Sequence, residues 1–242
     1  MAKQIVIGDI HGALKALKEV LTKAQLEKND TLIFLGDYVD GWSESAQVID
    51  YLLELDKQYH CIFLKGNHDA WCEDWLSEDT APRDWLISGG YSTITSYEQL
   101  SDERKAIHLQ FYNRMRKFLE AEDRLFIHAG FSSMHGPGRD RYESNYYWDR
   151  SLWELALATD DRISKDSNRY PKRLRLYSEI FIGHTPTINY DSMLPMHASN
   201  VWNVDTGAAF TGRLTAMNVE TKEYWQSEIV QKLYPGEKGR NP

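Results

Sequence analysis

Side chains that bind metal ions in proteins stand in five short segments of this 242-residue chain. Each segment follows a short apolar run and carries aspartate, asparagine or histidine beside small residues. The segments are Gly8-Asp9-Ile10-His11-Gly12, Gly36-Asp37-Tyr38-Val39-Asp40-Gly41, Gly66-Asn67-His68-Asp69, His128-Ala129-Gly130 and Gly183-His184-Thr185. Polar residues at the ends of buried strands predict a two-metal site at one edge of a sheet.

The first two segments supply carboxylates. Asp9 and His11 alternate with Ile10, so their side chains point the same way where the backbone is extended. Asp37 repeats this placement one strand-helix unit later, which makes it the natural ligand to be shared by two cations. The competing interpretation of Asp9 is a cap for a helix that begins near Gly12.

The remaining segments supply neutral ligands. Asn67 offers an amide oxygen, and His128 and His184 offer imidazole nitrogens. A single histidine after a strand is commonly structural, but six ligands at strand ends are hard to explain by chance. Mixed carboxylate, amide and imidazole ligands suit manganese, iron or zinc better than magnesium or calcium, and manganese is favoured.

Apolar periodicity in the first 64 residues predicts the elements that carry these ligands. Short apolar runs predict strands at 5–7, 31–35 and 61–64, and helical spacing predicts helices near 14–21 and 46–55. Such alternation is typical of βαβ units and of a parallel sheet covered by helices. In these sheets ligands bind beyond the carboxyl ends of the strands, where the first three segments lie.

The alternation stops after residue 69. We expect one domain over 1–242 with two insertions: a mostly helical one at about 70–122, which includes a helix over 98–119, and an irregular one at 135–176. Strands return at 124–127, 180–182 and 201–204, and a hairpin follows at 214–219 and 223–225. From residue 235 onward the polar sequence predicts a frayed tail.

Composition excludes several classes of protein. The net charge of −8 argues against a nucleic-acid partner, and no apolar run approaches the roughly 18 residues of a membrane helix. Only four residues precede the first predicted strand, which leaves no room for a signal peptide, and two cysteines form no disulfide framework. We therefore expect a cytoplasmic protein without a membrane partner; its oligomeric state is not predicted.

In their order, the five segments resemble those of the calcineurin-like metallophosphoesterases. They are most similar to the phosphoprotein-phosphatase branch, which includes small bacterial and phage serine/threonine phosphatases. Three more segments look like that branch, namely Trp85-Leu86-Ile87-Ser88-Gly89-Gly90, Trp148-Asp149-Arg150 and Val204-Asp205-Thr206-Gly207-Ala208. The resemblance implies an α/β fold of four layers in the order αββα, with mixed β-sheets flanked by helices and a helical cap insertion.

The resemblance also implies how the metal ligands are shared. One divalent cation is held by Asp9, His11 and Asp37, and a second is held by Asp37, Asn67, His128 and His184. Two cations that share one carboxylate lie about 3.5 Å apart and lower the pKa of a bridging water. The resulting hydroxide attacks the phosphorus of a phosphate monoester without a phosphoenzyme.

By the same resemblance, His68 is the general acid for the leaving oxygen, and Asp40 orients it and keeps it protonated. Without the resemblance, Asp40 would be read as a turn residue and His68 as a surface imidazole. Asn67 and Arg150 are expected to contact the substrate phosphate, although Arg150 alone could equally form a surface salt bridge.

The second segment departs from the branch. The branch continues Asp-Arg-Gly, and its arginine grips the substrate phosphate, whereas this chain reads Asp40-Gly41-Trp42. Glycine cannot replace a bidentate arginine. Asp69 also stands where protein phosphatases usually have glutamate.

Three hypotheses about function remain. The first is a serine/threonine protein phosphatase-like enzyme that acts on phosphorylated proteins or small phosphoesters. The second is a nucleotide phosphodiesterase or diadenosine tetraphosphate hydrolase, favoured by the missing arginine, by the basic stretch 162–175 and by aromatic side chains able to stack a base. Those aromatic side chains, most of which we expect to pack in the cap, are Trp42, Trp71, Tyr146, Tyr147 and Trp148. The third is a metal-binding scaffold without activity.

Overall fold

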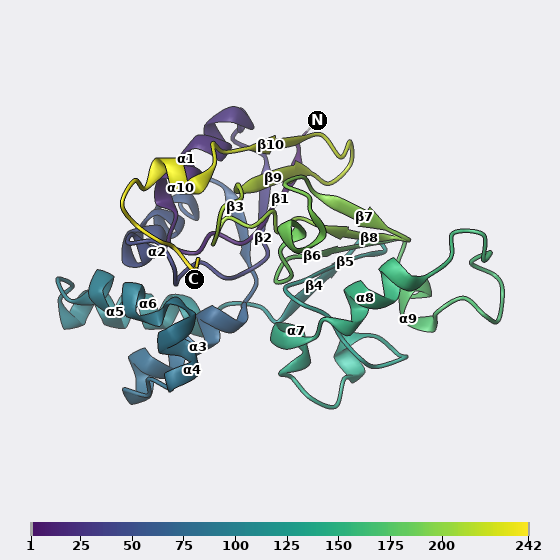
Figure 1. The fold of residues 1–242 in the computed structure, drawn as a ribbon, viewed down its shortest axis with the longest axis horizontal. Helices are drawn as coiled ribbons and strands as arrows, with labels where there is room; N and C mark the ends of the chain where they lie inside the picture. The colour runs from purple at the N-terminus through teal and green to yellow at the C-terminus, as the bar shows by residue number, and fades with distance from the viewer. Residues whose placement is uncertain (1, 242) are drawn as a thin grey trace.

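The computed structural model describes residues 2–241 and contains two mixed five-stranded sheets (Figure 1). The strands of the first sheet are β1 (Gln4–Ile7), β2 (Thr31–Phe34), β3 (His60–Phe63), β9 (Thr215–Asn218) and β10 (Tyr224–Gln226). The strands of the second are β4 (Phe118–Ala121), β5 (Arg124–Ile127), β6 (Glu179–Ile182), β7 (Met196–Ala198) and β8 (Val201–Asn203).

Helices follow the strands and cover the outer faces of the sheets. The α-helices are α1 (Leu14–Lys23), α2 (Ser45–Leu55), α3 (Asn67–Glu78), α4 (Arg83–Trp85), α5 (Tyr91–Tyr97), α6 (Asp102–Asn113), α7 (Asn145–Trp148), α8 (Ser151–Ala158), α9 (Lys172–Arg175) and α10 (Val230–Leu233). Short π- or 3-10 helical turns are η1 (Leu86–Gly90), η2 (Pro137–Arg139) and η3 (Thr187–Tyr190). In Figure 1 the helices α3 to α6 gather at one side of the molecule.

Each sheet has a parallel centre with antiparallel edges. The order in the first sheet is β10-β9-β1-β2-β3, in which β1, β2 and β3 run parallel. The order in the second is β4-β5-β6-β8-β7, in which β5, β6 and β8 run parallel. The carboxyl ends of β1, β2, β5 and β6 therefore deliver their loops to one region, and the site lies there.

Alternation along the strands separates the layers. In β1, Ile5 and Ile7 pack against the helices, while Val6 packs into a second cluster that joins the two sheets. In β5 the central Phe126 enters the same inter-sheet cluster and stacks on Phe181 of β6, with ring centroids 4.9 Å apart. The layers are thus helix, sheet, sheet and helix, which confirms the predicted α/β class.

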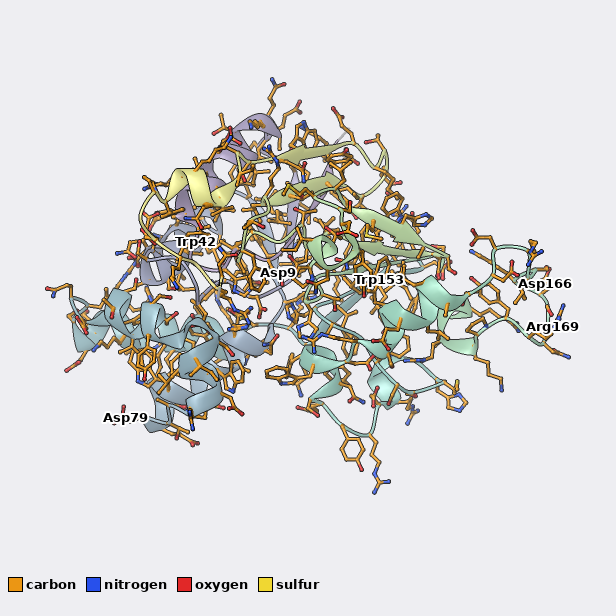
Figure 2. The ribbon with its side chains drawn as sticks, viewed as in Figure 1. Asp9, Trp42, Asp79, Trp153, Asp166 and Arg169 are labelled. Carbon is orange, nitrogen blue, oxygen red and sulfur yellow. The ribbon has the colours of Figure 1, made fainter. Side chains whose placement is uncertain are left out.

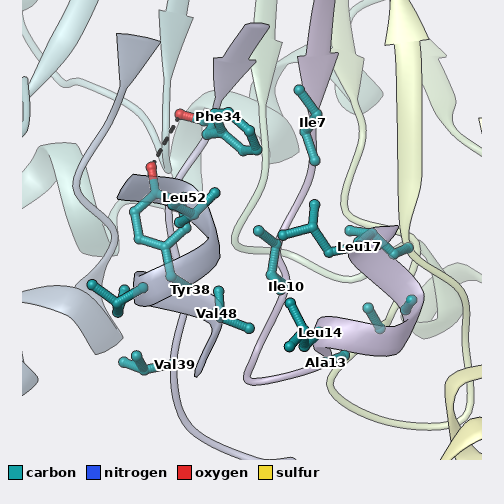
Figure 3. Packing of buried hydrophobic residues seen from close by; sticks show 14 of the residues in the cluster. Ile7, Ile10, Ala13, Leu14, Leu17, Phe34, Tyr38, Val39, Val48 and Leu52 are labelled. Atoms are coloured by element: carbon teal, nitrogen blue, oxygen red, sulfur yellow. Dashed lines mark hydrogen bonds between the residues drawn. The ribbon is translucent and has the colours of Figure 1, made fainter. Parts of the chain in front are cut away.

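A buried core holds the loops that follow β1 and β2. Figure 3 shows Ile10 and Leu17 packed beside Tyr38 and Val48 under these loops. The Tyr38 hydroxyl donates a 2.7 Å hydrogen bond to the Leu64 carbonyl, which ties the loop after β2 to the end of β3. Packing of this density leaves the site loops little freedom to shift.

Most of the predicted strands are confirmed, and five details differ from what the sequence predicted. The first predicted insertion contains β4, whose Phe118–Ala121 pair antiparallel with β5, and α6 ends at Asn113 well before residue 119. The second carries short helices, and β7 at Met196–Ala198 was not anticipated. The tail after residue 235 is folded against the molecule, as described below. None of the helices within 2–241 combines the length and apolar character needed to cross a membrane.

Candidate active site

The loops after five strands, β1, β2, β3, β5 and β6, bring the six predicted metal ligands together. Asp9 and His11 follow β1, Asp37 follows β2, and Asn67 opens α3. His128 follows β5 and His184 follows β6, so each sheet contributes. All six side chains are buried, with 7% exposure or less.

The ligand atoms form two groups with one shared member. His11, Asp37 and His68 place one ligand atom each within 4.8 Å of one another, and so do Asp37, His128 and His184. Membership of Asp37 in both groups is what a bridging carboxylate requires. The first group differs from the predicted set, because it contains His68 in place of Asp9.

Asp9 and Asn67 stand at the edges of these groups. An Asp9 carboxylate oxygen lies 3.9 Å from His11 Nε2, and the same oxygen accepts a 3.0 Å hydrogen bond from the His184 backbone N–H. Asn67 Oδ1 lies 3.1 Å from His128 Nε2 and 2.9 Å from His184 Nδ1. The amide oxygen thus stands where the second predicted set needs it.

Backbone carbonyls fix the orientation of two of the imidazoles. Nδ1 of His11 lies 3.1 Å from the Val39 carbonyl and 3.0 Å from that of Asp40, and Nδ1 of His128 lies 3.0 Å from that of Leu35. A carbonyl only accepts, so Nδ1 must carry the proton in both rings. Nε2 then offers its lone pair to the site, which is how metal-binding histidines are commonly held.

Four residues of the site, among eleven non-glycine residues of 2–241 with a positive φ, have a left-handed backbone. His11, Asp37, Asp40 and His184 have φ values of 53°, 54°, 72° and 67°, in the left-handed region that such residues rarely adopt. Strain of this kind persists only where the surrounding structure imposes it, and it clusters at functional sites.

Burial controls the electrostatics of the cluster. Burial raises the pKa of Asp37 to about 7, and it raises the pKa of Asp9 well above the ordinary value, with further contributions from Asp205 and Asp37. Burial lowers the pKa of His128 to about 4, so this imidazole is neutral and free to bind a metal. A group of buried carboxylates that repel one another is stabilised by bound cations.

Two atoms of the cluster support this conclusion directly. Asp9 Oδ1 and His184 Nε2 are buried and lack a hydrogen-bond partner among residues 2–241. Leaving such atoms unpaired is costly unless something else binds them. A Cβ at Gly183 would approach Asp9 Oδ1 to 2.1 Å, so the glycine makes room for the carboxylate. The donor set and its unpaired atoms fit a pair of divalent cations.

His68 and Asp40 form a hydrogen-bonded pair beside the cluster. His68 Nδ1 lies 2.5 Å from Asp40 Oδ2, which leaves Nε2 to face a substrate. Trp85 Nε1 and Thr93 Oγ1 also donate to the Asp40 carboxylate, at 2.7 Å and 2.5 Å. Burial raises the pKa of Asp40 to about 7 and lowers the pKa of His68. Both directions favour a neutral pair that holds one proton between Nδ1 and Oδ2, contrary to the expectation that Asp40 keeps the imidazole protonated.

Sequence reasoning missed the residues that hold this pair and the loops in place. Trp85 and Thr93 come from the helical region, and no motif assigned them to Asp40. Asp69 was noticed only as a departure from glutamate, yet its buried carboxylate accepts hydrogen bonds from the backbone N–H groups of Asp37, Tyr38 and Gly66 at 2.7, 2.9 and 2.8 Å. It ties the loop after β2 to the start of α3.

Asp205 was also missed, although its segment was recognised. It is buried, and burial raises its pKa to about 7 with a further contribution from Asp37. The position of Asp205 shortly after β8 could have pointed to it, because the candidate ligands Asp9 and Asp37 also follow strands.

Arg150 is exposed at the rim of the site. Burial is the main cause that lowers the pKa of His128 and His184, and the positive charge of Arg150 adds to it in both. The guanidinium therefore lies within electrostatic reach of the second ligand group. Among residues 2–241 no ion pair to Arg150 is found, which contradicts the alternative of a surface salt bridge.

The aromatic side chains considered for base stacking differ in their burial. Trp42 is fully buried and stacks on Tyr234 with centroids 5.3 Å apart, and Tyr146 is buried too, so both pack. Trp148 is 40% exposed and lies edge to face with Trp71, at 4.8 Å. The Trp71 ring lies 5.2 Å from that of His68, so this indole pair borders the site.

Part of the basic stretch 162–175 projects away from the centre of the molecule. In Figure 2 its residues Asp166 and Arg169 lie on a loop that projects from the edge of the molecule, whereas Asp9 lies near the centre. Arg162 pairs with Asp160, and Arg173 donates a 2.6 Å hydrogen bond to the Phe131 carbonyl. Arg173 is 12% exposed and also lies 3.8 Å from Asp149, next to Arg150, so it packs against the protein and differs from the projecting loop.

Comparison with known proteins agrees with this geometry. A family model described as calcineurin-like phosphoesterase matches residues 2–200. The asymmetrical bis(5'-nucleosyl)-tetraphosphatase PrpE of Oceanobacillus iheyensis is similar, with 26% identity over 234 residues, which cover 90% of this chain and 89% of that protein.

Two solved structures share the fold. A provisionally assigned diadenosine tetraphosphatase superposes with a TM-score of 0.63 at 16% identity, over 93% of this chain and 92% of that one. A protein serine/threonine phosphatase from Saccharomyces cerevisiae superposes with a TM-score of 0.61 at 14% identity, over 93% of this chain and 79% of that one. Since the family model spans most of the chain, this protein belongs to the calcineurin-like phosphoesterases and is a phosphoric ester hydrolase.

Proposed function

We propose that this enzyme hydrolyses nucleotide polyphosphates of the dinucleoside tetraphosphate type. The observation that carries the proposal is the indole pair Trp71–Trp148, which borders the ligand cluster and is exposed at Trp148. An indole face stacks a nucleobase, and such stacking contributes about 1–3 kcal/mol per base. The similarity to a bis(5'-nucleosyl)-tetraphosphatase supports the same substrate class.

The ligand cluster would hold two divalent cations. Asp9, His11 and Asp37 would hold the first, and Asp37 would share the second with the set Asn67, His128 and His184. Bound cations of this kind polarise phosphate oxygens and activate water. The mixed oxygen and nitrogen ligands favour manganese, with iron or zinc as alternatives.

The other side chains would divide the remaining work. Water adds to phosphorus, one P–O bond breaks, and the leaving oxygen takes a proton. His68 would give that proton from Nε2 in its doubly protonated form, which the negative charge of a bound phosphate would favour, while Asp40 holds Nδ1 at 2.5 Å and so fixes the ring. Arg150 would bind phosphate oxygens at the rim, next to the base stacked on Trp148.

Parallel hydrolysis assays test the substrate. Diadenosine tetraphosphate, a phosphoserine peptide and a cyclic nucleotide would be supplied at equal concentration to the manganese-loaded enzyme. We expect kcat/KM to be highest for the tetraphosphate. A preference for the phosphoserine peptide would instead support the protein-phosphatase hypothesis, and preference for the cyclic nucleotide would indicate a phosphodiesterase. A metal-loaded protein inactive on all three would indicate the scaffold hypothesis.

Trp148→Ala tests the role of the indole. We expect about a tenfold higher KM for diadenosine tetraphosphate and little change for inorganic tripolyphosphate, which has no base to stack. Tyr224→Ala is the matched control, because Tyr224 on β10 is an aromatic side chain of equal exposure, 41%, away from the cluster. Equal KM changes for both substrates would contradict base stacking on Trp148.

A further inference from the structure

The segment after α10 is held against the loop that follows Asp40. Tyr234 is buried and stacks on Trp42, and its hydroxyl donates to Glu44. The Glu237 carboxylate accepts hydrogen bonds from the backbone N–H and the hydroxyl of Ser43, at 3.0 and 2.9 Å. In Figure 1 this segment runs from α10 past α2 and ends beside it. We call residues 234–241 the C-terminal strap.

The last part of the strap is fixed as tightly as the first. A Cβ at Gly239 would lie 2.6 Å from the Trp42 ring, so the strap backbone lies directly on the indole. The backbone N–H of the next residue, Arg240, donates a 2.8 Å hydrogen bond to the Ala209 carbonyl. These contacts fix the backbone from which the Arg240 side chain extends.

That side chain occupies the space beside Gly41. A Cβ at Gly41 would lie 3.2 Å from Arg240 Cγ, and a Cβ at Gly89 would lie 3.3 Å from the same atom. Gly41 has a φ of +116°, a conformation that side-chain-bearing residues rarely adopt. An arginine at residue 41 would therefore have a strained backbone, and its Cβ would crowd the Arg240 side chain. Glycine at residue 41, where the branch has arginine, thus leaves the space that the Arg240 side chain fills.

The charge of Arg240 acts on the site. Burial is the main cause of the lowered pKa values of His11 and His68, and the charge of Arg240 is the next largest. Burial raises the pKa values of Asp37 and Asp40 to about 7, and the same charge opposes that rise. Arg240 thus acts chiefly on the first ligand group and on the His68–Asp40 pair, whereas Arg150 acts on His128 and His184.

The Arg240 guanidinium contacts an aromatic ring, but one of its nitrogens lacks a hydrogen-bond partner within 2–241. Its central carbon lies 5.3 Å from the centroid of the Phe210 ring, a cation–π contact that steadies the group. Its Nε is buried and has no hydrogen-bond partner within 2–241. A cavity of about 840 Å³, lined in part by Gly41, Gly89 and Arg240, opens beside it.

We propose that Arg240 binds a substrate phosphate at the metal site, in the role of the arginine that residue 41 lacks. The inference rests on the proposed two-metal site but not on the identity of the substrate, since any phosphoester presents the same oxygens. Arg150 and Arg240 would then approach the phosphate from the two ligand groups. The strap supplies by tertiary contact a side chain that related enzymes carry within a motif.

The test compares Arg240→Ala, Arg240→Lys and a control in the manganese-loaded full chain. The control is Lys232→Ala, which removes one positive charge from the exposed face of α10 and leaves the strap contacts intact. The measurements are KM and kcat for an aryl phosphate, the inhibition constant of inorganic phosphate, bound manganese and the melting temperature.

We expect Arg240→Ala to raise KM and the inhibition constant of phosphate about tenfold each with manganese content unchanged, because a charge-assisted bidentate contact is lost. Arg240→Lys keeps the charge and the aliphatic stem beside Gly41 but lacks the planar fork, so it should raise both constants less. Lys232→Ala should change neither. Added guanidinium ion should partly rescue Arg240→Ala.

Two outcomes separate the inference from the proposed function. Turnover by the unmodified enzyme together with unchanged phosphate inhibition in Arg240→Ala would overturn the role of Arg240 alone. Absence of turnover by the unmodified enzyme on every phosphoester would overturn the proposed function. Should Arg240→Ala fail to fold, unchanged constants in Arg240→Lys would also overturn the inference, because that variant retains the packing.

Discussion

Asp40 shows how much of the candidate chemistry depends on a single side chain. Its two carboxylate oxygens accept hydrogen bonds from His68, Trp85 and Thr93, and it is fully buried. Three donors from separate segments fix the carboxylate, and the carboxylate fixes the imidazole. The position of the His68 imidazole is therefore defined by the helices α3 to α5 as much as by the loop after β2.

His68→Asn tests proton donation at the residue scale. We expect turnover to fall about a hundredfold on an alkyl phosphate and much less on an aryl phosphate, because an acidic leaving oxygen needs little protonation. His60→Asn, at the exposed end of β3, is the control and should leave both rates unchanged. An equal loss on both substrates with full metal content would contradict a general-acid role.

Single residues also mark where sequence reasoning reached its limit. The candidate metal ligands could be proposed because each lies shortly after an apolar strand. Trp42 could not be assigned to stacking or packing, since its partner Tyr234 stands in the strap and contacts across such separations leave no local pattern. Arg240 was invisible for the same reason: nothing in the sequence around it differs from an ordinary polar tail.

At the scale of elements, the start of α3 acts as a clamp on the loop after β2. Asp69 in its first turn accepts three backbone hydrogen bonds, two of them from the residues Asp37 and Tyr38. These bonds help hold Asp37 in its left-handed conformation. The strands themselves were predictable from apolar runs, whereas β4 was missed because Phe118–Ala121 is short and follows a helical pattern.

Asp69→Ala should disturb this clamp. We expect a loss of about 3 kcal/mol in the free energy of unfolding, because three buried N–H groups lose their acceptor, and lower manganese affinity because Asp37 is released. Chemical denaturation and metal titration measure the two effects. Asp74→Ala, on the exposed side of α3, is the matched control and should change stability by less than about 0.5 kcal/mol. Similar stability of the two variants would contradict the clamp.

At the scale of the whole molecule, two sheets share the task of holding a concentrated negative charge. Asp37, Asp40, Asp69 and Asp205 are buried close together, and burial raises the pKa of each to about 7. The sequence predicted that both halves of the chain would contribute, because histidines follow strands in each. That the chain forms one domain with two insertions stays a prediction, as does its cytoplasmic location.

The raised pKa values predict how pH and metal act together on stability. In the metal-free protein these carboxylates ionise near pH 7 when folded but near pH 4 when unfolded, so folded stability falls as pH rises between these values. Bound divalent cations pair with the ionised forms and remove this loss. Manganese is therefore expected to raise the melting temperature, relative to the protein in chelator, more at pH 8 than at pH 5. We expect the increase at pH 8 to exceed that at pH 5 by about 3 °C or more.

Asp37→Asn supplies the control for this measurement, because it removes the carboxylate common to both ligand groups. Its melting temperature should respond little to manganese at either pH. A manganese effect of equal size at pH 5 and pH 8 in the unmodified protein would show that the buried carboxylates do not ionise on metal binding.

The C-terminal strap has a consequence for the order in which the protein assembles. Its contact between Glu237 and Ser43 spans 194 residues, and closing so long a loop is costly in entropy until both sheets are already formed. During synthesis the metal ligands can come together while residue 240 is still inside the ribosome. The proposed phosphate-binding Arg240 would then be the last residue of the site to reach its position. A nascent chain could therefore bind its metals before it could bind a substrate phosphate through Arg240.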